Sequence, residues 1–469
     1  MRGIKKFFKG KQTIATIAAT MASLVGLTAC SGKTQPGGSN SGSGKVQTIS
    51  VGYFEGAYLD THWKSWEKLY NEAHPNEKIE LALEGDGSYG SAIENLLMTG
   101  VVPDIMVAPM TWRKYASKGW LEPLGDVYSA DFGSEKTIEG ALNGEIKDNL
   151  KFKNEYYAVP FSEYMTGIAV NKGFFDEHGW KIPETMTDML DIIGKISELP
   201  ENKDADADND ISAFAWSGVE SQYYWNYVMN TWWADYGGMN QISMFKKMED
   251  PSVYLLSGRE KAVDALLTLI GGNKSPKNCA DGVMGATNLE AQMLFVQGKA
   301  LMMPNASWLE VEMLKNTPEG FEMVLVAPPT IEGGSGEKNL YGHVDEWLII
   351  PQAAENKDAA KKFVSFIFSE KGLLDFFEKT NTTSVFEVDY TKANTEQLTA
   401  FGKSVLSLRS KRNIFYSESS SPLMYMGLEN FWQIKMETEM VTQGQTAKEI
   451  VQYDYNQVVS DWDGWQKQI

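Results

Sequence analysis

Four aspartates alternate with other small or amide residues in the segment DADADNDIS, residues 204–212. Asp204, Asp206 and Asp208 occupy the first, third and fifth positions of a calcium-binding loop, with Asp210 two residues further on. Asn209 stands where such a loop has its turn glycine, and position twelve is Ala215 instead of the bidentate glutamate. Two interpretations stay open. One is a structural calcium site of modest affinity, and the other is a solvated acidic turn.

A glycine motif, G-x-G-x-x-G, runs from Gly85 to Gly90 between an expected strand and an expected helix. In dinucleotide-binding folds this motif lets the backbone approach a pyrophosphate, and an acid about twenty residues later binds the ribose. Here the motif falls in the second strand–helix unit, and Asp104, the acid at that spacing, begins a strand. We therefore favour a loop that faces another kind of ligand.

Catalytic patterns are weak in this sequence. None of the four histidines pairs with another at metal-ligand spacing, and there is no G-x-S-x-G motif. Cys279 has no histidine near it in sequence, which favours a plain thiol. The 62 acidic residues could supply a glycosidase pair almost anywhere, so their number is not evidence for one. We expect neither catalytic residues nor a required cofactor.

Aromatic residues are concentrated in YYWNYVMNTWWADY, residues 223–236. Trp225, Met229, Trp232 and Tyr236 recur at helical spacing, as do Tyr223 and Tyr227. One core stripe explains only part of this pattern. We expect one stripe to be buried and the Tyr223–Trp225 end to line a cleft, where aromatic faces suit sugar rings.

Cys30 lies in LTACS, directly after a basic N-terminal segment and a stretch, Gln12–Ala29, without charge. This is typical of a secretory signal, here residues 1–29, although a membrane-spanning anchor is the alternative. The segment resembles a bacterial lipobox, which implies cleavage before Cys30 and lipidation of its thiol. Residues 30–45 would then be a flexible tether. We expect an extracytoplasmic protein that is lipid-anchored to the bacterial cell membrane.

The formal net charge of −19 limits the classes of molecule that the protein can be expected to bind. Loss of the basic signal makes the remaining chain more acidic still, which argues against nucleic acid and against a strongly anionic ligand. After lipidation of Cys30 only Cys279 is left, so no internal disulfide forms. A chain of this length can bury large cores in two domains, and we expect a monomer.

Strand and helix patterns alternate after the tether. We expect strands over 47–54, 77–84 and 104–109, alternating with helices over 61–75, 88–100 and 111–120. This order predicts a mostly parallel sheet, whose ligands bind beyond the carboxyl ends of its strands. A hairpin-like stretch, 152–172, follows. Beyond it we expect helices over 185–199, 223–237, 258–271, 288–298, 307–316, 357–378, 396–408, 422–443 and 446–467, with strands over 211–218, 300–304, 321–329 and 346–352.

Several stretches together resemble one family, the extracellular solute-binding proteins of carbohydrate ABC transporters. LLMTGVVPDIMV, YYAVPFSEYMTGIAVNKGFFDEHGW, FVQGKALMMPNASW and WLIIPQAAENKDAAKKFVSF occur in the family's order, and the match covers nearly all of 46–469. The segment from AQMLF to GFEM is most similar to the branch named for N-acetylglucosamine and diacetylchitobiose.

This resemblance implies an α/β, two-lobed, periplasmic-binding-protein-like fold, with hinge strands and a ligand in the cleft. It implies lobe I from 46–160 and 344–411, and lobe II from 161–343 and 412–469, with crossings near 160–164, 341–346 and 410–415. It also implies a sugar or oligosaccharide ligand and ABC permease subunits as partners. A lipid-anchored glycoside hydrolase and a polysaccharide adhesin remain the alternatives.

Ligand contacts carry over from the family by position. The resemblance places the following there: Phe54, Glu55, Asp86, Met110 and Trp112 in the first lobe, Glu163 and Tyr164 at the hinge, and Tyr223, Tyr224, Trp225, Trp308, Phe431 and Trp432 in the second lobe. Trp308, in the stretch NASW, is the residue most strongly implied.

Overall fold

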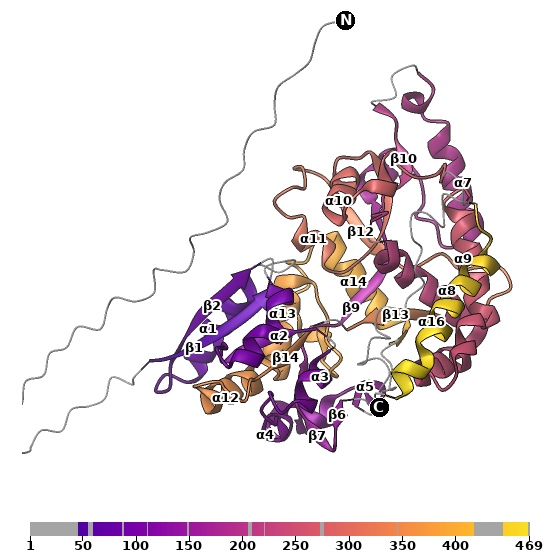
Figure 1. The fold of residues 1–469 in the computed structure, drawn as a ribbon. Coiled ribbons are helices and arrows are strands. Elements are labelled where there is room, and N and C mark those ends of the chain that lie inside the picture. Colours follow the sequence, from indigo (N-terminus) through magenta and orange to yellow (C-terminus); the bar gives the residue numbers. More distant parts are fainter. Residues whose placement is uncertain are drawn as a thin grey trace, which may run out of the picture. The chain divides into compact units, whose positions relative to one another are not determined.

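The computed structural model describes residues 46–54, 60–86, 89–109, 111–147, 150–204, 209–219, 221–272, 276–344, 346–416 and 444–467. Two sheets dominate this part of the chain, and each has its own hydrophobic core. We call each sheet with its core and covering helices a lobe (Figure 1). Among the described residues, no helix has the length and apolar character that crossing a bilayer requires.

The first sheet has the strand order β2-β1-β3-β14-β8. Strands β1 (Gln47–Phe54), β2 (Ile79–Asp86) and β3 (Ile105–Ala108) run parallel, while β14 (Trp347–Ile349) and β8 (Val159–Pro160) are antiparallel to their neighbours. The longer helices described in this lobe are α1 (Thr61–Ala73), α2 (Tyr89–Thr99), α3 (Trp112–Ser117), α12 (Lys357–Ile367) and α13 (Glu370–Thr380).

Helix α1 shows why these segments fold as they do. Its buried residues, His62, Trp63, Trp66 and Tyr70, recur at helical spacing on one face, and Pro75 follows its end. The Trp66 indole also donates to the Gly372 carbonyl oxygen at 2.9 Å, which ties α1 to α13. Orange α12 and β14 also lie beside indigo and violet elements although the sequence separates them widely (Figure 1).

The second sheet has the order β10-β11-β9-β13-β15, with β12 also paired to β9. The strands are β9 (Tyr164–Asn171), β10 (Ser212–Phe214), β11 (Ala300–Ala306), β12 (Met323–Val326), β13 (Asn339–His343) and β15 (Asn413–Phe415). The helices are α6 (Lys172–Glu177), α7 (Met186–Ser197), α8 (Ser221–Lys247), α9 (Ser257–Leu269), α10 (Asn288–Val296), α11 (Leu309–Glu312), α14 (Ala400–Lys411) and α16 (Ala447–Gln466).

Short elements fill the connections. They are α4 (Gly125–Tyr128), β4 (Asp131–Gly133), β5 (Lys136–Thr137), α5 (Gly144–Lys147), β6 (Lys151–Phe152), β7 (Glu155–Tyr156) and single 3-10 turns at 139–141, 200–202, 251–255, 283–285 and 390–392.

The chain passes between the two cores several times. Tyr164 belongs to the first core and Met165 to the second, and Tyr341 and Val344 mark the return. The next change of core lies between Phe386 and Ala393. Helix α14 packs on the second sheet, against β12, and a further change of core lies between Phe415 and Tyr416, beside the crossing expected at 410–415.

Most expected elements are present, with shifted ends. The expected helix 357–378 is two helices, α12 and α13, because Ser369 caps a new helix by accepting from the Gly372 amide. The expected helix 223–237 is the longer α8, which is kinked at Gly238. Strands β13 and β15 lie at the crossings expected near 341–346 and 410–415, although the residue pattern alone did not single them out as strands. The expected helix 422–443 lies outside the described residues.

Candidate functional site

An aromatic cluster lies where the two cores meet, and its centre is Trp308. The partly buried Trp308 side chain packs against both cores. Its ring meets the Tyr164 ring edge to face at a centroid distance of 4.6 Å, the Tyr227 ring at 5.9 Å and the Tyr224 ring at 6.3 Å. The His343 ring lies 5.1 Å from that of Tyr227. We call these five residues the aromatic junction.

Strand pairing positions these residues. β9 begins at Tyr164, which is paired with His343 of β13. β9 also pairs with β11, so the residues after Ala306, including Trp308, arrive beside the start of β9. Helix α8 adds Tyr224 and Tyr227, which lie about one turn apart and therefore share a face.

Hydrogen bonds fix the polar ends of the junction. The Tyr164 hydroxyl donates to Glu346 Oε2 at 2.8 Å, and the Ser162 hydroxyl donates to the same oxygen at 3.2 Å. The Tyr341 hydroxyl and His343 Nδ1 are 3.1 Å apart. The junction thus combines aromatic faces with hydroxyl, imidazole and carboxylate groups, which suits a polar, uncharged ligand that has apolar faces.

Glu163 does not present its carboxylate to a ligand. Its side chain is fully buried, Oε2 accepts from Arg409 Nε at 3.0 Å, and Oε1 accepts from the Tyr416 hydroxyl. The negative charge of Glu163 raises the pKa of the Arg409 guanidinium. The structure therefore does not support Glu163 as a direct ligand contact.

Two expected tryptophan contacts also lie in the cores. Trp112 is fully buried, 5.9 Å from the ring of Trp347, with the Arg113 guanidinium 4.4 Å from its own ring. Trp225 is fully buried against Phe214 and Trp216. Neither indole offers a face to a ligand in this structure. The residues of α8 that contact Trp308 are Tyr224 and Tyr227. The packing of α8 in three dimensions determines which of its faces points to the junction.

Other expected contacts fall where side chains are not described. Glu55, Met110, Phe431 and Trp432 lie outside the described residues, and the side chains of Phe54, Asp86 and Tyr223 are likewise not described. The backbones of Phe54 and Asp86 are paired at the carboxyl ends of β1 and β2. The glycine motif begins at Gly85, inside β2, and its role as a ligand-facing loop stays a prediction.

The acidic segment gives no support for calcium. Asp204 Oδ2 accepts from Asn209 Nδ2 at 3.0 Å, while Asp206 and Asp208 lie outside the described residues. Asp210 borders a hollow of about 640 Å³ in the second lobe. Within the described ranges, no group of three or more histidine, cysteine or acidic side chains is arranged to hold a metal ion.

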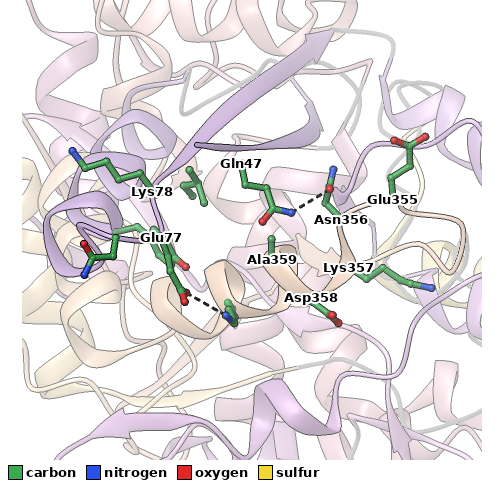
Figure 2. A pocket seen from close by; sticks show the side chains of 12 residues that line it. Gln47, Glu77, Lys78, Glu355, Asn356, Lys357, Asp358 and Ala359 are labelled. Atoms are coloured by element: carbon green, nitrogen blue, oxygen red, sulfur yellow. Dashed lines mark hydrogen bonds and ion pairs between the residues drawn. The ribbon is translucent and has the colours of Figure 1, made fainter. Parts of the chain in front are cut away.

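A polar groove of about 560 Å³ lies at the opposite edge of the first sheet (Figure 2). It is lined at the start of β1 by Gln47, whereas the ligand-facing edge is at the end of that strand. Its side chains bond to one another: Gln47 Nε2 donates to Asn356 Oδ1 at 3.2 Å, and Lys362 pairs with Glu77 at 3.2 Å (Figure 2). The groove is therefore separate from the aromatic junction.

Sequence reasoning missed Tyr227, His343 and Glu346 as members of the junction or its hydrogen bonds. Tyr227 was assigned only to a helical stripe, and His343 and Glu346 lie beside the expected second crossing. Their proximity to the crossing was the available signal, since crossing strands converge where the lobes meet.

Comparison with known proteins identifies the family. The family model described as bacterial extracellular solute-binding protein matches residues 55–373. The chain belongs to this family. Its members serve transport by binding solutes and are not enzymes, and they need no cofactor, so the expectation of a non-catalytic protein is confirmed.

Curated relatives carry sugar-binding names. A multiple sugar-binding protein of Streptococcus mutans is 23% identical over 72% of this chain and 76% of its own length. A maltooligosaccharide ABC transporter solute-binding lipoprotein of Streptococcus pneumoniae is 25% identical over 80% of each chain. The diacetylchitobiose-binding protein NgcE of Streptomyces coelicolor is 23% identical over 55% of this chain and 52% of its own.

Solved structures share the fold. The bacterial solute receptor AcbH has a TM-score of 0.65 at 17% identity and covers 89% of this chain and 99% of its own. An ABC substrate-binding protein from Listeria monocytogenes has a TM-score of 0.64 at 15% identity, with 89% and 100% covered. These likenesses confirm the expected two-lobed α/β solute-binding fold.

Proposed function

We propose that this solute-binding protein captures a sugar or oligosaccharide and delivers it to an ABC importer. The observation that carries the proposal is the aromatic junction around Trp308, placed where the two lobes meet. Pyranose rings have apolar C–H faces and polar rims, and the junction has aromatic faces with polar groups at their edges. The sugar-binding names of the curated relatives support the same class of ligand.

Within this proposal Trp308 supplies the main stacking face, with Tyr224 and Tyr227 beside it. Tyr164 and Glu346 supply hydrogen-bonding groups, already oriented by their mutual bond of 2.8 Å. Phe54, Glu55, Asp86, Met110, Tyr223, Phe431 and Trp432 stay proposed contacts on the grounds of the family resemblance.

We further propose that residues 1–29 are a signal peptide, that Cys30 carries the lipid, and that 30–45 tether a monomer to the outer face of the cell membrane. The support is the lipobox-like sequence and a relative that is named a lipoprotein. Lobe I would comprise 46 to about 164, 344 to about 386 and Tyr416, and lobe II the remainder, including α14 and α16.

Calorimetry with a panel of sugars tests the proposal. The panel includes maltooligosaccharides, diacetylchitobiose, raffinose, galactose and long polysaccharides. Saturable one-to-one binding of a mono- or oligosaccharide is expected. Binding of long chains alone would indicate an adhesin, and binding of none of the sugars, with a folded protein, would overturn the proposal.

A further inference from the structure

A fully buried carboxylate lies at the point where the chain first leaves the first lobe. Glu163 stands between β8 of the first sheet and β9 of the second, and its side chain is fully buried. Its amide donates to the Thr383 carbonyl oxygen at 3.0 Å, and the Thr383 hydroxyl donates to the Glu163 carbonyl oxygen at 3.0 Å. The backbone of this crossing is therefore held to a second segment of the first lobe.

The partners of the carboxylate belong to different lobes. Arg409, whose Nε donates at 3.0 Å, is in α14, and its neighbours Val405 and Leu408 are members of the second core. Tyr416, whose hydroxyl donates to the other oxygen, is a member of the first core. One carboxylate thus bonds to both lobes at once. We call Glu163, Arg409 and Tyr416 the hinge triad.

Burial of the Glu163 carboxylate makes its hydrogen bonds essential. A carboxylate out of water is stable only when it is paired with a cation and its oxygens accept hydrogen bonds. Both oxygens have such a partner here, and the Arg409 side chain is only 26% exposed. A rotation of the lobes that moved Arg409 away from Tyr416 would have to stretch or break bonds to a buried charge.

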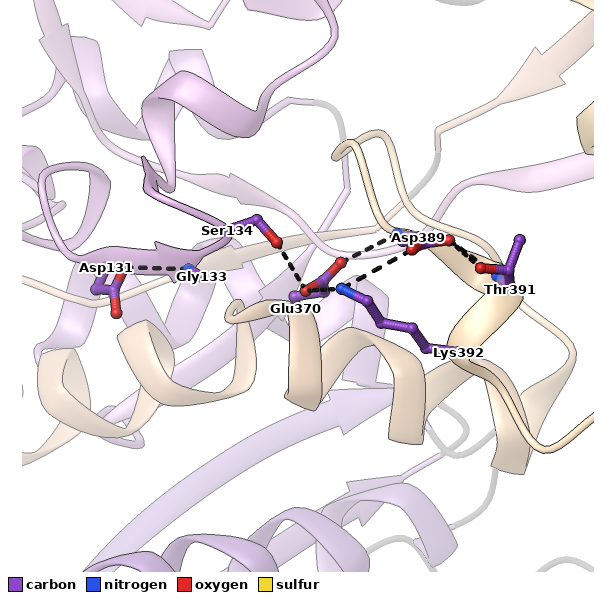
Figure 3. Close-up of polar contacts among 7 residues, drawn as sticks. All are labelled: Asp131, Gly133, Ser134, Glu370, Asp389, Thr391 and Lys392. Carbon is purple, nitrogen blue, oxygen red and sulfur yellow. Dashed lines mark hydrogen bonds and ion pairs between the residues drawn. The ribbon is translucent and has the colours of Figure 1, made fainter.

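An ion pair at another crossing provides the contrast (Figure 3). Glu370 accepts from Lys392 at 2.7 Å and from the Ser134 hydroxyl at 3.2 Å, close to the passage between Phe386 and Ala393. The Lys392 side chain is 48% exposed, against 14% for Glu370, so water competes for the cation and the pair contributes little to any preferred geometry. Burial therefore distinguishes the hinge triad from this exposed pair.

We propose that the hinge triad sets the resting angle between the two lobes, so that Glu163 governs closure without touching the ligand. The proposal rests on the function proposed above, because an angle between lobes matters for a protein that encloses a solute. A contact that differs between conformations is what shifts their populations.

Small-angle scattering of the full chain without ligand tests the proposal. Arg409→Lys keeps the charge and loses the planar guanidinium, while Tyr416→Phe keeps the ring and loses one hydrogen bond. Both variants are expected to fold and to show a larger radius of gyration than the wild type. An unchanged radius in both folded variants would overturn the proposal.

Two matched controls separate the hinge from general loosening. Asp454→Asn breaks a buried ion pair to Arg259 inside the second lobe, at 2.8 Å, and Lys392→Met removes the exposed pair. Neither is expected to change the radius, although the first lowers stability. An equal increase of the radius in Asp454→Asn would count against a specific hinge role. Because no sugar is present, this result is independent of whether wild type binds one in calorimetry.

Discussion

Tyr164 and Trp308 meet edge to face, with ring centroids 4.6 Å apart and ring planes at 90°. One begins β9 and the other follows β11, and the pairing of Thr166 with Ala306 brings them together. Tyr164 belongs to the first core and Trp308 packs against both cores, so this contact lies at the boundary between them. Trp308 is only partly buried, whereas the other four rings of the junction are buried, so the indole is its most accessible ring.

Trp308→Ala is expected to weaken sugar binding by roughly tenfold to a thousandfold. Loss of an indole face removes a few kcal/mol of burial at ~25 cal/mol per Å², and each ~1.4 kcal/mol is tenfold in affinity. The measurement is calorimetry against the sugar that the panel identifies, beside thermal melts without ligand.

Trp225→Phe is the matched control, because Trp225 is fully buried away from the junction. It is expected to lower the melting temperature by several degrees while affinity stays close to that of the wild type. If Trp308→Ala behaved in the same way, with intact affinity and a large loss of stability, Trp308 would be a core residue.

The sequence predicts local features well because they depend on neighbours along the chain. The helical spacing of His62, Trp63, Trp66 and Tyr70 and the stop at Pro75 give α1 almost to the residue. The break between α12 and α13 was missed although Ser369 carries the side-chain oxygen that caps a helix start. In that region a continuous apolar pattern outweighed the capping signal.

Features fixed by distant partners could not be predicted in the same way. β13 and β15 are three to five residues long, and they are strands because β9 and each other supply their hydrogen bonds. Likewise, Trp225 and Tyr227 are both aromatic residues of one helix. Only packing against β13 decides that Tyr227 faces the junction and that Trp225 faces Phe214.

Asp454→Asn is expected to destabilise the protein by about 3–5 kcal/mol, because it leaves the Arg259 guanidinium buried without its counter-charge. Urea unfolding measures the loss. The double variant Arg259→Met/Asp454→Leu removes both charges and is expected to recover much of the stability. If the double variant were no more stable than Asp454→Asn, the loss of stability would come from altered packing and not from the unpaired charge.

Cys30→Ser is expected to release the protein from the membrane. The proposed tether depends on one thioether, and several buried acyl CH₂ groups at ~0.8 kcal/mol each would be lost together. Fractionation of cells into membrane and medium measures the release, and mass spectrometry of the wild-type chain should show lipid on Cys30. Cys279→Ser is the control. Retention of Cys30→Ser in the membrane would instead indicate an uncleaved N-terminal anchor.

Asp235→Asn is expected to stabilise the protein at neutral pH and not at pH 4. Burial raises the pKa of Asp235 to about 6, while an unfolded aspartate titrates near ~3.9. The folded protein therefore holds this proton more tightly than the unfolded chain does. The contribution of Asp235 to the free energy of unfolding falls as pH rises from about 4 to about 6 and is constant above. The full cost of ionisation is on the order of 2–3 kcal/mol.

The measurement is the difference in urea unfolding free energy between Asp235→Asn and wild type at several pH values, since the other carboxylates cancel in that difference. Asp188→Asn serves as a control of opposite sign. The Thr185 hydroxyl and amide, which donate to Asp188, lower the pKa of this carboxyl, so its contribution is present at neutral pH and is lost on acidification. A pH-independent effect of Asp235→Asn would contradict the raised pKa and assign the change to altered hydrogen bonding with Asn339.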